Sequence, residues 1–409
     1  MKYVIIIPDG AADSPLVELD GRTPLEAAKT PHTDALARAG RQGTAATTPR
    51  GMPCGSDVCT MSLLGYDPEQ YHRGRAPLEA AALGIDLDPA DWIFRVNLVT
   101  VADGRMQDHS GGHISDREGR SLLEDFAREF HVPGMELHAG VSYRNILVDV
   151  SGRTGDGRDW SELATTPPHD IPGEPISRHM PVGSPHADLL RQLITDSEQF
   201  LAQHEINLTR QEMGEPPATH FWPWGQGQRP DMPRFEERFG VRGAMITAVD
   251  LLAGISSFIG WDRLNVPGQT SYHDNDYVAT GKWAVDALDA YDLICVHVEA
   301  PDEASHAADA ETKIAAIEAI DQHVVGPIAE ALKRQGDWRL LILPDHYTRV
   351  ETRKHDPTPV PFVMAGTRVA GVRQQPFSEK NAKAADLHIQ RGHELMEFFL
   401  HSGKQAVSK

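Results

Sequence analysis

The chain has 409 residues, a formal net charge of −20 and three cysteines. An acidic chain of this kind is a poor partner for nucleic acid or an anionic membrane, and no apolar run approaches the ~20 residues of a membrane span. The length suggests two domains. So few cysteines exclude a disulfide scaffold and favour a reducing compartment. The first apolar run is also too short for a signal peptide, so we expect a cytoplasmic protein.

The first predicted element is a strand over residues 3–7, which ends at Pro8-Asp9-Gly10. This run is apolar without alternation, which is typical of a central strand in a parallel sheet, buried on both faces. Ligands of such sheets bind beyond the carboxyl ends of the strands. Asp9 is therefore a candidate site residue.

The next candidate is Ser56, which precedes a helix-like run over residues 59–64. Its position predicts a helix N-cap. A hydroxyl at a helix N-terminus also lies near free backbone N–H groups and the positive end of the helix dipole. Ser56 is thus either a cap or a nucleophile, and the pattern leaves both open.

From about Asp86 the pattern changes to shorter strands, at 95–101, 136–139 and 145–150, with loops over 151–185. An amphipathic helix is predicted over 189–204 and an aromatic-rich loop over 219–228. We interpret residues 90–230 as a smaller α+β domain. It would be inserted into a discontinuous first domain of residues 1–89 and 231–409.

A second apolar strand, Asp292 to Cys295, leads to Asp302 and His306. If a helix starts near Pro301, these two side chains share one face and can bind one cation. Taken alone, the pair also fits a helix cap followed by a surface histidine. A long helix is expected over 314–334.

A third apolar run, Leu340 to Leu343, ends at Pro344-Asp345-His346, and His355 follows in a proline-containing segment. The strand ends therefore bring three aspartates and three histidines to one rim. The charged side chains of such a group would repel one another or be poorly solvated unless a cation lay among them. The joint pattern favours a metal site.

In order, the motifs are Pro-Asp-Gly, Gly-Ser-Asp, Pro-Asp-Glu-x-x-His, Pro-Asp-His and Lys-His-Asp-Pro-Thr-Pro. As a set they resemble the archaeal-type 2,3-bisphosphoglycerate-independent phosphoglycerate mutases of the alkaline phosphatase superfamily. The resemblance implies an α/β three-layer sandwich with a central, mainly parallel sheet. It also implies interconversion of 2- and 3-phosphoglycerate through a phosphoserine, without 2,3-bisphosphoglycerate.

The same resemblance implies two divalent metal ions, with Mn²⁺ favoured and Zn²⁺, Co²⁺ or Mg²⁺ as alternatives. Ser56 resembles the phosphorylated nucleophile. One ion would be held by Asp9, Ser56, Asp345 and His346, and the other by Asp302, His306 and His355. Apart from Ser56, these are the side chains that the strand-end argument selects.

In the inserted domain, the family uses a histidine for the glycerate hydroxyl and arginines for the substrate's charges. His113 is our first candidate for the histidine and His109 the second, with surface-loop histidines as the alternative. Arg144 resembles a substrate contact, although Asn145 stands where bacterial-type enzymes have aspartate. Arg75 and Arg210 are further substrate-binding candidates, with an exposed structural arginine as the alternative.

Three other functions remain open at this point. The same phosphoserine chemistry would serve another acceptor, such as homoserine in threonine synthesis, or water in a metal-dependent phosphatase. A non-catalytic metal-binding protein is disfavoured, because both the metal ligands and Ser56 are present. The expected partner is a small phosphorylated substrate, and the sequence does not specify an oligomeric state.

Overall fold

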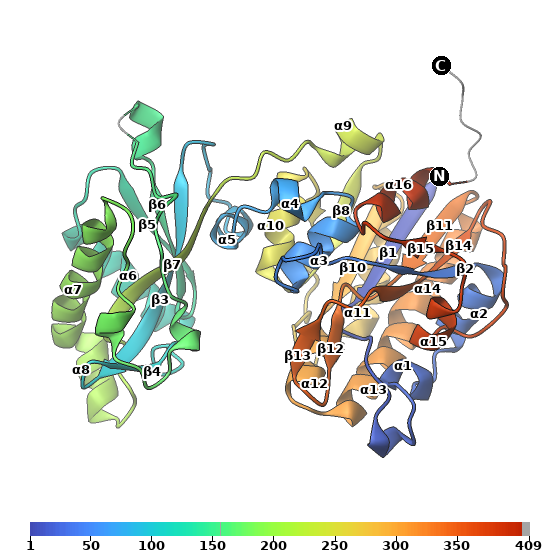
Figure 1. Ribbon diagram of the computed structural model, residues 1–409, viewed down its shortest axis with the longest axis horizontal. Helices are drawn as coiled ribbons and strands as arrows, with labels where there is room; N and C mark the ends of the chain where they lie inside the picture. Colours follow the sequence, from blue (N-terminus) through green and yellow to red (C-terminus); the bar gives the residue numbers. More distant parts are fainter. Residues whose placement is uncertain (156, 403–409) are drawn as a thin grey trace. The chain divides into compact units, whose positions relative to one another are not determined.

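The computed structural model describes residues 1–155 and 157–402 (Figure 1). It divides into two compact units. One contains Met1–His72 together with Met232–Lys409, and the other is the intervening segment Arg73–Asp231. The first unit is therefore discontinuous in sequence.

The first unit is built on an eight-stranded mixed sheet. Strand β1 (Lys2–Pro8) lies at its centre, parallel to β10 (Leu293–Val298) on one side and to β11 (Trp338–Ile342) on the other. The remaining strands are β8 (Gly243–Ile246), β9 (Asp262–Arg263), β14 (Val360–Gly366), β2 (Arg41–Ala45) and β15 (His388–Ile389). Only β14 runs against its neighbours among these described strands, so the predicted mainly parallel sheet is confirmed.

Both faces of this sheet are covered. Consecutive residues of β1 and β10 are buried, although successive side chains point to opposite faces. One group of helices in mutual contact consists of α2 (Pro31–Ala39), α11 (Tyr277–Ala287), α13 (Ala310–Ile320), a π-helical turn (Asp321–Val325) and α14 (Gly326–Arg334). A second group consists of α3 (Ser56–Leu63), α10 (Asp250–Phe258) and α16 (Glu394–His401). The unit is thus the predicted three-layer α/β sandwich (Figure 1).

Shorter elements complete this unit. The hairpin of β12 (Tyr347–Arg349) and β13 (Lys354–Asp356) follows β11. The short helices are α1 (Pro24–Ala27), α4 (Pro68–Tyr71), α9 (Phe235–Phe239), α12 (Ala300–His306) and α15 (Glu379–Lys383).

The second unit is an antiparallel α+β structure. Strand β3 (Trp92–Ala102) pairs with β4 (Arg105–Asp108), β6 (Arg144–Asp149) and β7 (His220–Gln228), and β5 (Met135–Val141) pairs with β6. Its helices are α5 (Ala76–Ala82), α6 (Asp116–Glu129), α7 (Ala187–Gln203) and α8 (Glu205–Glu212). Its core combines aliphatic side chains with aromatic ones, among them Phe94, Phe126, Trp160 and Phe221.

The structure departs from the sequence-based expectations at several elements. Helix α5 packs on β3 and β7, so residues 73–89 lie in the second unit and the predicted boundary after residue 89 falls inside it. Residues 220–228 form a strand, not a loop, because β7 pairs in the described chain with β3 alone and therefore tolerates Pro223. Ser56 is the first residue of α3, and Gly55 occupies the predicted N-cap position.

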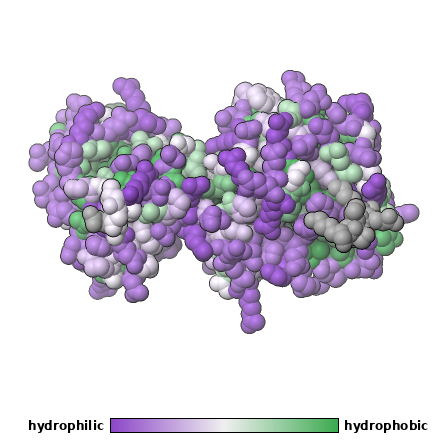
Figure 2. Space-filling model, turned by 90° about the horizontal axis from the view of Figure 1, so that it is seen from above, coloured by the Kyte–Doolittle hydropathy of each residue, from purple (hydrophilic) through white to green (hydrophobic). Residues whose placement is uncertain are grey.

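On the face drawn in Figure 2, hydrophilic residues cover most of the surface and hydrophobic residues lie between them in small areas. Within the described ranges, no helix has both the length and the apolar character needed to span a membrane.

Ile5 tests the importance of the central strand. Its side chain is fully buried in β1, so Ile5→Ala leaves a cavity, and we expect unfolding to become easier by about 2–5 kcal/mol. Val17→Ala is the control, since Val17 is 97% exposed. Urea unfolding followed by circular dichroism measures the free energy of unfolding of both variants. Equal stability of the two variants would contradict the placement of Ile5 in the core.

Candidate active site

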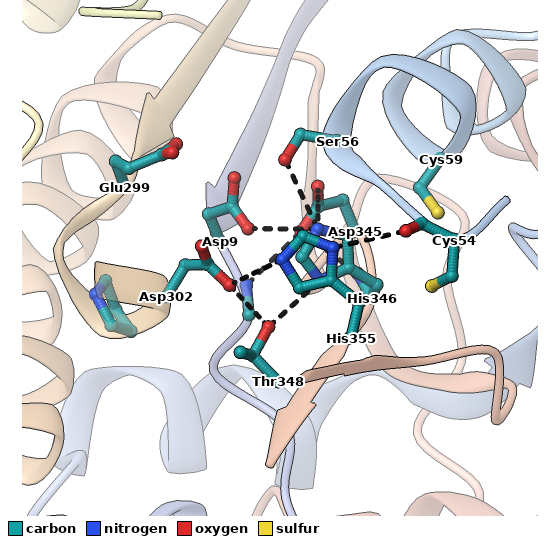
Figure 3. A network of polar contacts seen from close by, with 12 residues as sticks. Asp9, Cys54, Ser56, Cys59, Glu299, Asp302, Asp345, His346, Thr348 and His355 are labelled. Carbon is teal, nitrogen blue, oxygen red and sulfur yellow. Dashed lines mark hydrogen bonds and ion pairs between the residues drawn. The ribbon is translucent and has the colours of Figure 1, made fainter. Parts of the chain in front are cut away.

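Three aspartates meet beyond the carboxyl ends of the three central strands (Figure 3). Asp9 follows β1, and its backbone N–H donates to the carbonyl of Val298 at the end of β10 at 3.0 Å. Asp302 lies in the first turn of α12, directly after β10, and Asp345 follows β11. All three are buried. The parallel register of β1, β10 and β11 is therefore what brings them together.

Two carboxylate oxygens in this cluster have no hydrogen-bond partner. Oδ1 of Asp345 accepts backbone N–H groups from Gly10 at 3.3 Å and from His346 at 3.0 Å. Oδ2 of Asp345 and Oδ1 of Asp9 are buried without a partner among the described residues. Buried oxygens of this kind are costly unless something satisfies them. They fit the donor set of a divalent cation.

His346 faces these oxygens together with Ser56. Its Nε2 lies 3.3 Å from Asp345 Oδ2, 3.5 Å from Asp9 Oδ1 and 3.2 Å from Ser56 Oγ. Burial lowers the pKa of His346, although Asp345 opposes this shift, and a neutral imidazole is the form that binds metals. The ligand atoms of Asp9, Asp345 and His346 all lie within 4.8 Å of one another. Ser56 completes this group at the start of α3.

A second group forms around Asp302. Its Oδ2 lies 3.1 Å from His306 Nε2 and its Oδ1 lies 3.4 Å from His355 Nε2. His306 is one helical turn after Asp302 in α12, as the spacing predicts. His355 reaches the group from β13, and its ring stacks on His346 with centroids 4.0 Å apart.

The two histidines of the second group present their Nε2 atoms to each other. Nδ1 of His306 donates to the carbonyl of Arg353 at 2.9 Å, and Nδ1 of His355 donates to the carbonyl of Cys54 at 3.2 Å. A carbonyl only accepts, so in the neutral rings both Nε2 atoms carry lone pairs. These atoms are 3.0 Å apart. Only a shared proton or a cation relieves that contact, and the oxygen and imidazole donors suit a divalent metal.

The pKa shifts describe the same electrostatic conflict. Burial, followed by the charges of Asp345, Glu299 and Asp302, raises the pKa of Asp9 well above its usual value. Burial also opposes ionisation of Asp302, but hydrogen bonds from His306 and His355 hold its pKa well below the usual range. Despite burial, contact with Asp302 raises the pKa of His355 to about 9. Without a metal ion, protons have to supply the positive charge of the site.

Sequence reasoning missed three polar residues of this centre. His297 Nε2 lies 2.7 Å from Asp9 Oδ2, and Glu299 Oε2 lies 3.5 Å from the same ring nitrogen. Asp9, His297 and Glu299 form a further set of potential ligands. The third is Thr348, whose hydroxyl contacts Asp302 and His346. The available signals were His297, a polar residue within the apolar strand β10, and Glu299, which follows the end of that strand.

The candidates in the second unit have different environments. His109 is half-exposed and lies edge-on to Tyr143 and His169, with ring centroids at 5.8 and 6.1 Å. His113 is exposed and has a positive φ of 53°. Asn145 is buried, and its side chain donates to the carbonyl of Tyr143 and accepts from the N–H of Gly140. Asn145 therefore stabilises the β5–β6 turn, next to the exposed Arg144.

The arginines also separate into two kinds. Arg210 is buried, and its guanidinium is bound to the carbonyls of Pro216 and Gly112 and to Glu118, so we leave it out of the proposed site. Burial raises the pKa of Glu79. The charges of Arg95, Arg144 and Arg75 oppose this rise, with Arg95 the strongest and Arg75 the weakest of the three. The positive charges of three guanidinium groups therefore act on the Glu79 carboxylate.

Arg95 is another residue that sequence reasoning missed. Its Nε donates to Glu79 Oε2 at 2.9 Å, and its guanidinium lies over the Trp224 ring at 4.0 Å. Trp224 in turn donates to Asn97 at 2.9 Å. These contacts hold Arg95 in one orientation.

The fold and the site together define an α/β protein with a carboxylate–imidazole centre at the strand ends. A family model described as 2,3-bisphosphoglycerate-independent phosphoglycerate mutase matches residues 37–207. The chain is 46% identical over 400 residues to 2,3-bisphosphoglycerate-independent phosphoglycerate mutase 2 of Methanothermobacter thermautotrophicus, covering 98% of this chain and 97% of that one. It is 43% identical to a probable 2,3-bisphosphoglycerate-independent phosphoglycerate mutase of Geobacter sulfurreducens, covering 98% of this chain and 100% of that one.

Among solved structures, a Pyrococcus horikoshii protein aligns with a TM-score of 0.81 and 28% identity, over 98% of this chain and 96% of that one. The cofactor-independent phosphoglycerate mutase of Thermoplasma acidophilum aligns with a TM-score of 0.68 and 25% identity, over 98% and 99%. The chain belongs to the family of 2,3-bisphosphoglycerate-independent phosphoglycerate mutases. The resemblance stated from the motifs is thereby confirmed.

The unpartnered oxygen of Asp345 provides a test of metal binding. Asp345→Asn removes its charge, and we expect the Mn²⁺ bound per chain to fall from two ions to one in equilibrium dialysis. Asp20→Asn is the control, because Asp20 is exposed and has a φ of 56°, which asparagine also adopts. Two bound ions in Asp345→Asn would contradict the ligand assignment.

Proposed function

We propose that this chain interconverts 2-phosphoglycerate and 3-phosphoglycerate by phosphoryl transfer through a phosphoserine at Ser56, with two divalent cations and without 2,3-bisphosphoglycerate. The observation that carries the proposal is the position of Ser56 Oγ, 3.2 Å from His346 Nε2. The same nitrogen lies 3.3 Å from Asp345 Oδ2 and 3.5 Å from Asp9 Oδ1. Family membership supports the choice of substrate. Mn²⁺ is favoured, with Zn²⁺, Co²⁺ and Mg²⁺ as alternatives.

The ligand groups proposed are Asp9, Ser56, Asp345 and His346 for one cation and Asp302, His306 and His355 for the other. When bound, the cations supply the Lewis-acid charge that favours an ionised serine hydroxyl and neutralises the oxygens of the transferring phosphoryl group. The chain itself supplies position. Ser56 begins α3, whose first turn directs backbone N–H groups towards an anion.

The reaction is two displacements at phosphorus. In the first, a bond forms between Ser56 Oγ and phosphorus while the bond from phosphorus to one glycerate oxygen breaks. In the second, the other glycerate hydroxyl attacks the phosphoserine and Ser56 leaves. Ser56 is regenerated and no water is consumed, so positioning and charge are the main tasks of the protein.

The second unit is the proposed holder of glycerate. Arg144 and Arg75 are proposed to bind its negative charges, and Arg95, which donates to Glu79, is proposed to add positive charge beside them. His113 or His109 is proposed to serve the glycerate hydroxyl. The contacts of His109 with Tyr143 and His169 favour His109 for this role. The three cysteines are free, which suits a cytoplasmic enzyme.

The direct experiment incubates Mn²⁺-loaded protein with 3-phosphoglycerate, in the absence of 2,3-bisphosphoglycerate, and follows 2-phosphoglycerate by ³¹P NMR. We expect 2-phosphoglycerate to accumulate without stoichiometric inorganic phosphate. Release of inorganic phosphate alone would support the phosphatase alternative. If the protein instead transfers a phosphoryl group to homoserine in a parallel reaction and shows no mutase activity, homoserine would be supported as the acceptor.

Ser56→Ala tests the nucleophile. We expect turnover to fall by about 10³-fold or more, because no other hydroxyl replaces the lost oxygen, and ³²P labelling of the protein to disappear. Ser257→Ala is the control, since Ser257 is an exposed serine of α10 in the same unit. Persistent labelling of Ser56→Ala would show that another residue is phosphorylated.

A further inference from the structure

The hydroxyl of Thr348 lies between the two proposed metal-binding groups. Thr348 is fully buried in β12. Its Oγ1 donates to Asp302 Oδ1, which belongs to one group, and lies 3.1 Å from Nδ1 of His346, which belongs to the other. Figure 3 shows this bridge. A Cβ added at Gly10 would approach both Asp302 Oδ1 and Thr348 Oγ1 to 2.5 Å, so the bridge also fills the space beyond β1.

The single proton of this hydroxyl determines the form of His346. An ionised carboxylate accepts hydrogen bonds but cannot donate them, so the O–H of Thr348 donates its hydrogen bond to Asp302. Thr348 can then only accept from His346, and the His346 proton has to lie on Nδ1. Nε2 is left with its lone pair towards Asp9 Oδ1, Asp345 Oδ2 and Ser56 Oγ. That tautomer is the one able to bind a cation there.

A buried ion pair holds Thr348 in place. Lys313 Nζ donates to the backbone carbonyl of Thr348 at 2.8 Å and to Asp13 Oδ2 at 2.9 Å, and Lys313 is fully buried. The N–H of Thr348 donates to the carbonyl of Ala12 at 3.2 Å, and the N–H of Val350 donates to Asp13 Oδ2 at 3.1 Å. The segment after β1 therefore tethers the backbone on both sides of the Thr348 hydroxyl.

We propose that Thr348 is a positioning residue that couples the two metal-binding groups, by fixing the tautomer of His346 and the orientation of Asp302 with one hydroxyl. The inference rests on the metal groups of the proposed function. It predicts that loss of the hydroxyl weakens the binding of both ions, since each metal-binding group contains one hydrogen-bond partner of Thr348. Loss of a hydrogen bond to a ligand of this kind typically weakens metal binding by about 10–100-fold.

Thr348→Val and Thr348→Ser separate the hydroxyl from the shape of the side chain. Mn²⁺ titration of the full chain by calorimetry is expected to show about 10–100-fold weaker binding of both ions in Thr348→Val, and nearly unchanged binding in Thr348→Ser. Thr33→Val is the matched control. Buried Thr33 donates to Asp321 Oδ1 at 2.6 Å in the same unit, so its loss removes a comparable bond without touching the site.

A spectroscopic measurement distinguishes positioning from general destabilisation. In ¹⁵N–¹H NMR of the metal-free protein, we expect the His346 proton on Nδ1 in the wild type and in Thr348→Ser, and a shift towards Nε2 in Thr348→Val. A wild-type proton on Nε2, or Thr348→Val with wild-type affinity for both ions, would overturn the inference alone. A wild-type protein that binds no Mn²⁺ would overturn the proposed metal centre as well.

Discussion

The structure depends on the burial of three carboxylates at one edge of a sheet. Asp9, Asp302 and Asp345 meet there because β1 lies between β10 and β11 in parallel register. Removing such groups from water is unfavourable unless opposite charge accompanies them. The raised pKa of Asp9, from burial and then from its carboxylate neighbours, is a direct sign of that cost. The sheet therefore provides a position where positive charge is required, and the histidines surround it.

The imidazoles are arranged by a common rule. In the three histidines of the proposed metal-binding groups, Nδ1 contacts an oxygen of Arg353, Cys54 or Thr348, and Nε2 is directed into the site. These outer contacts set tautomer and ring orientation before any ligand arrives. The centre is therefore preorganised by backbone carbonyls and one hydroxyl, which are hard to recognise as functional residues in a sequence.

The sequence could predict the residues whose role follows from local patterns, but not those whose role depends on contacts between distant segments. The strand-end aspartates were predictable because buried parallel strands are uninterrupted apolar runs, and the helical spacing of Asp302 and His306 is local. His297 was missed because its importance depends on the register of β10 with β1. Thr348 was missed because its contacts with Asp302 and His346 form only when the β12–β13 hairpin is folded against α12. Arg210 lies on a polar helix, yet Glu118 and two carbonyls bury it. Strand β7 was missed because Pro223 usually excludes a strand, whereas an edge position tolerates it.

The discontinuous first unit has a consequence for synthesis. Tyr3 of β1 pairs with Leu293 of β10, so the central strand is made long before either neighbour. At about 5–20 residues per second, the interval is on the order of 15–60 s. The contiguous segment Arg73–Asp231 contains its own core and emerges within that time. The nascent chain must therefore keep this buried strand from aggregating on the ribosome until its neighbours β10 and β11, in the last third of the protein, have been translated.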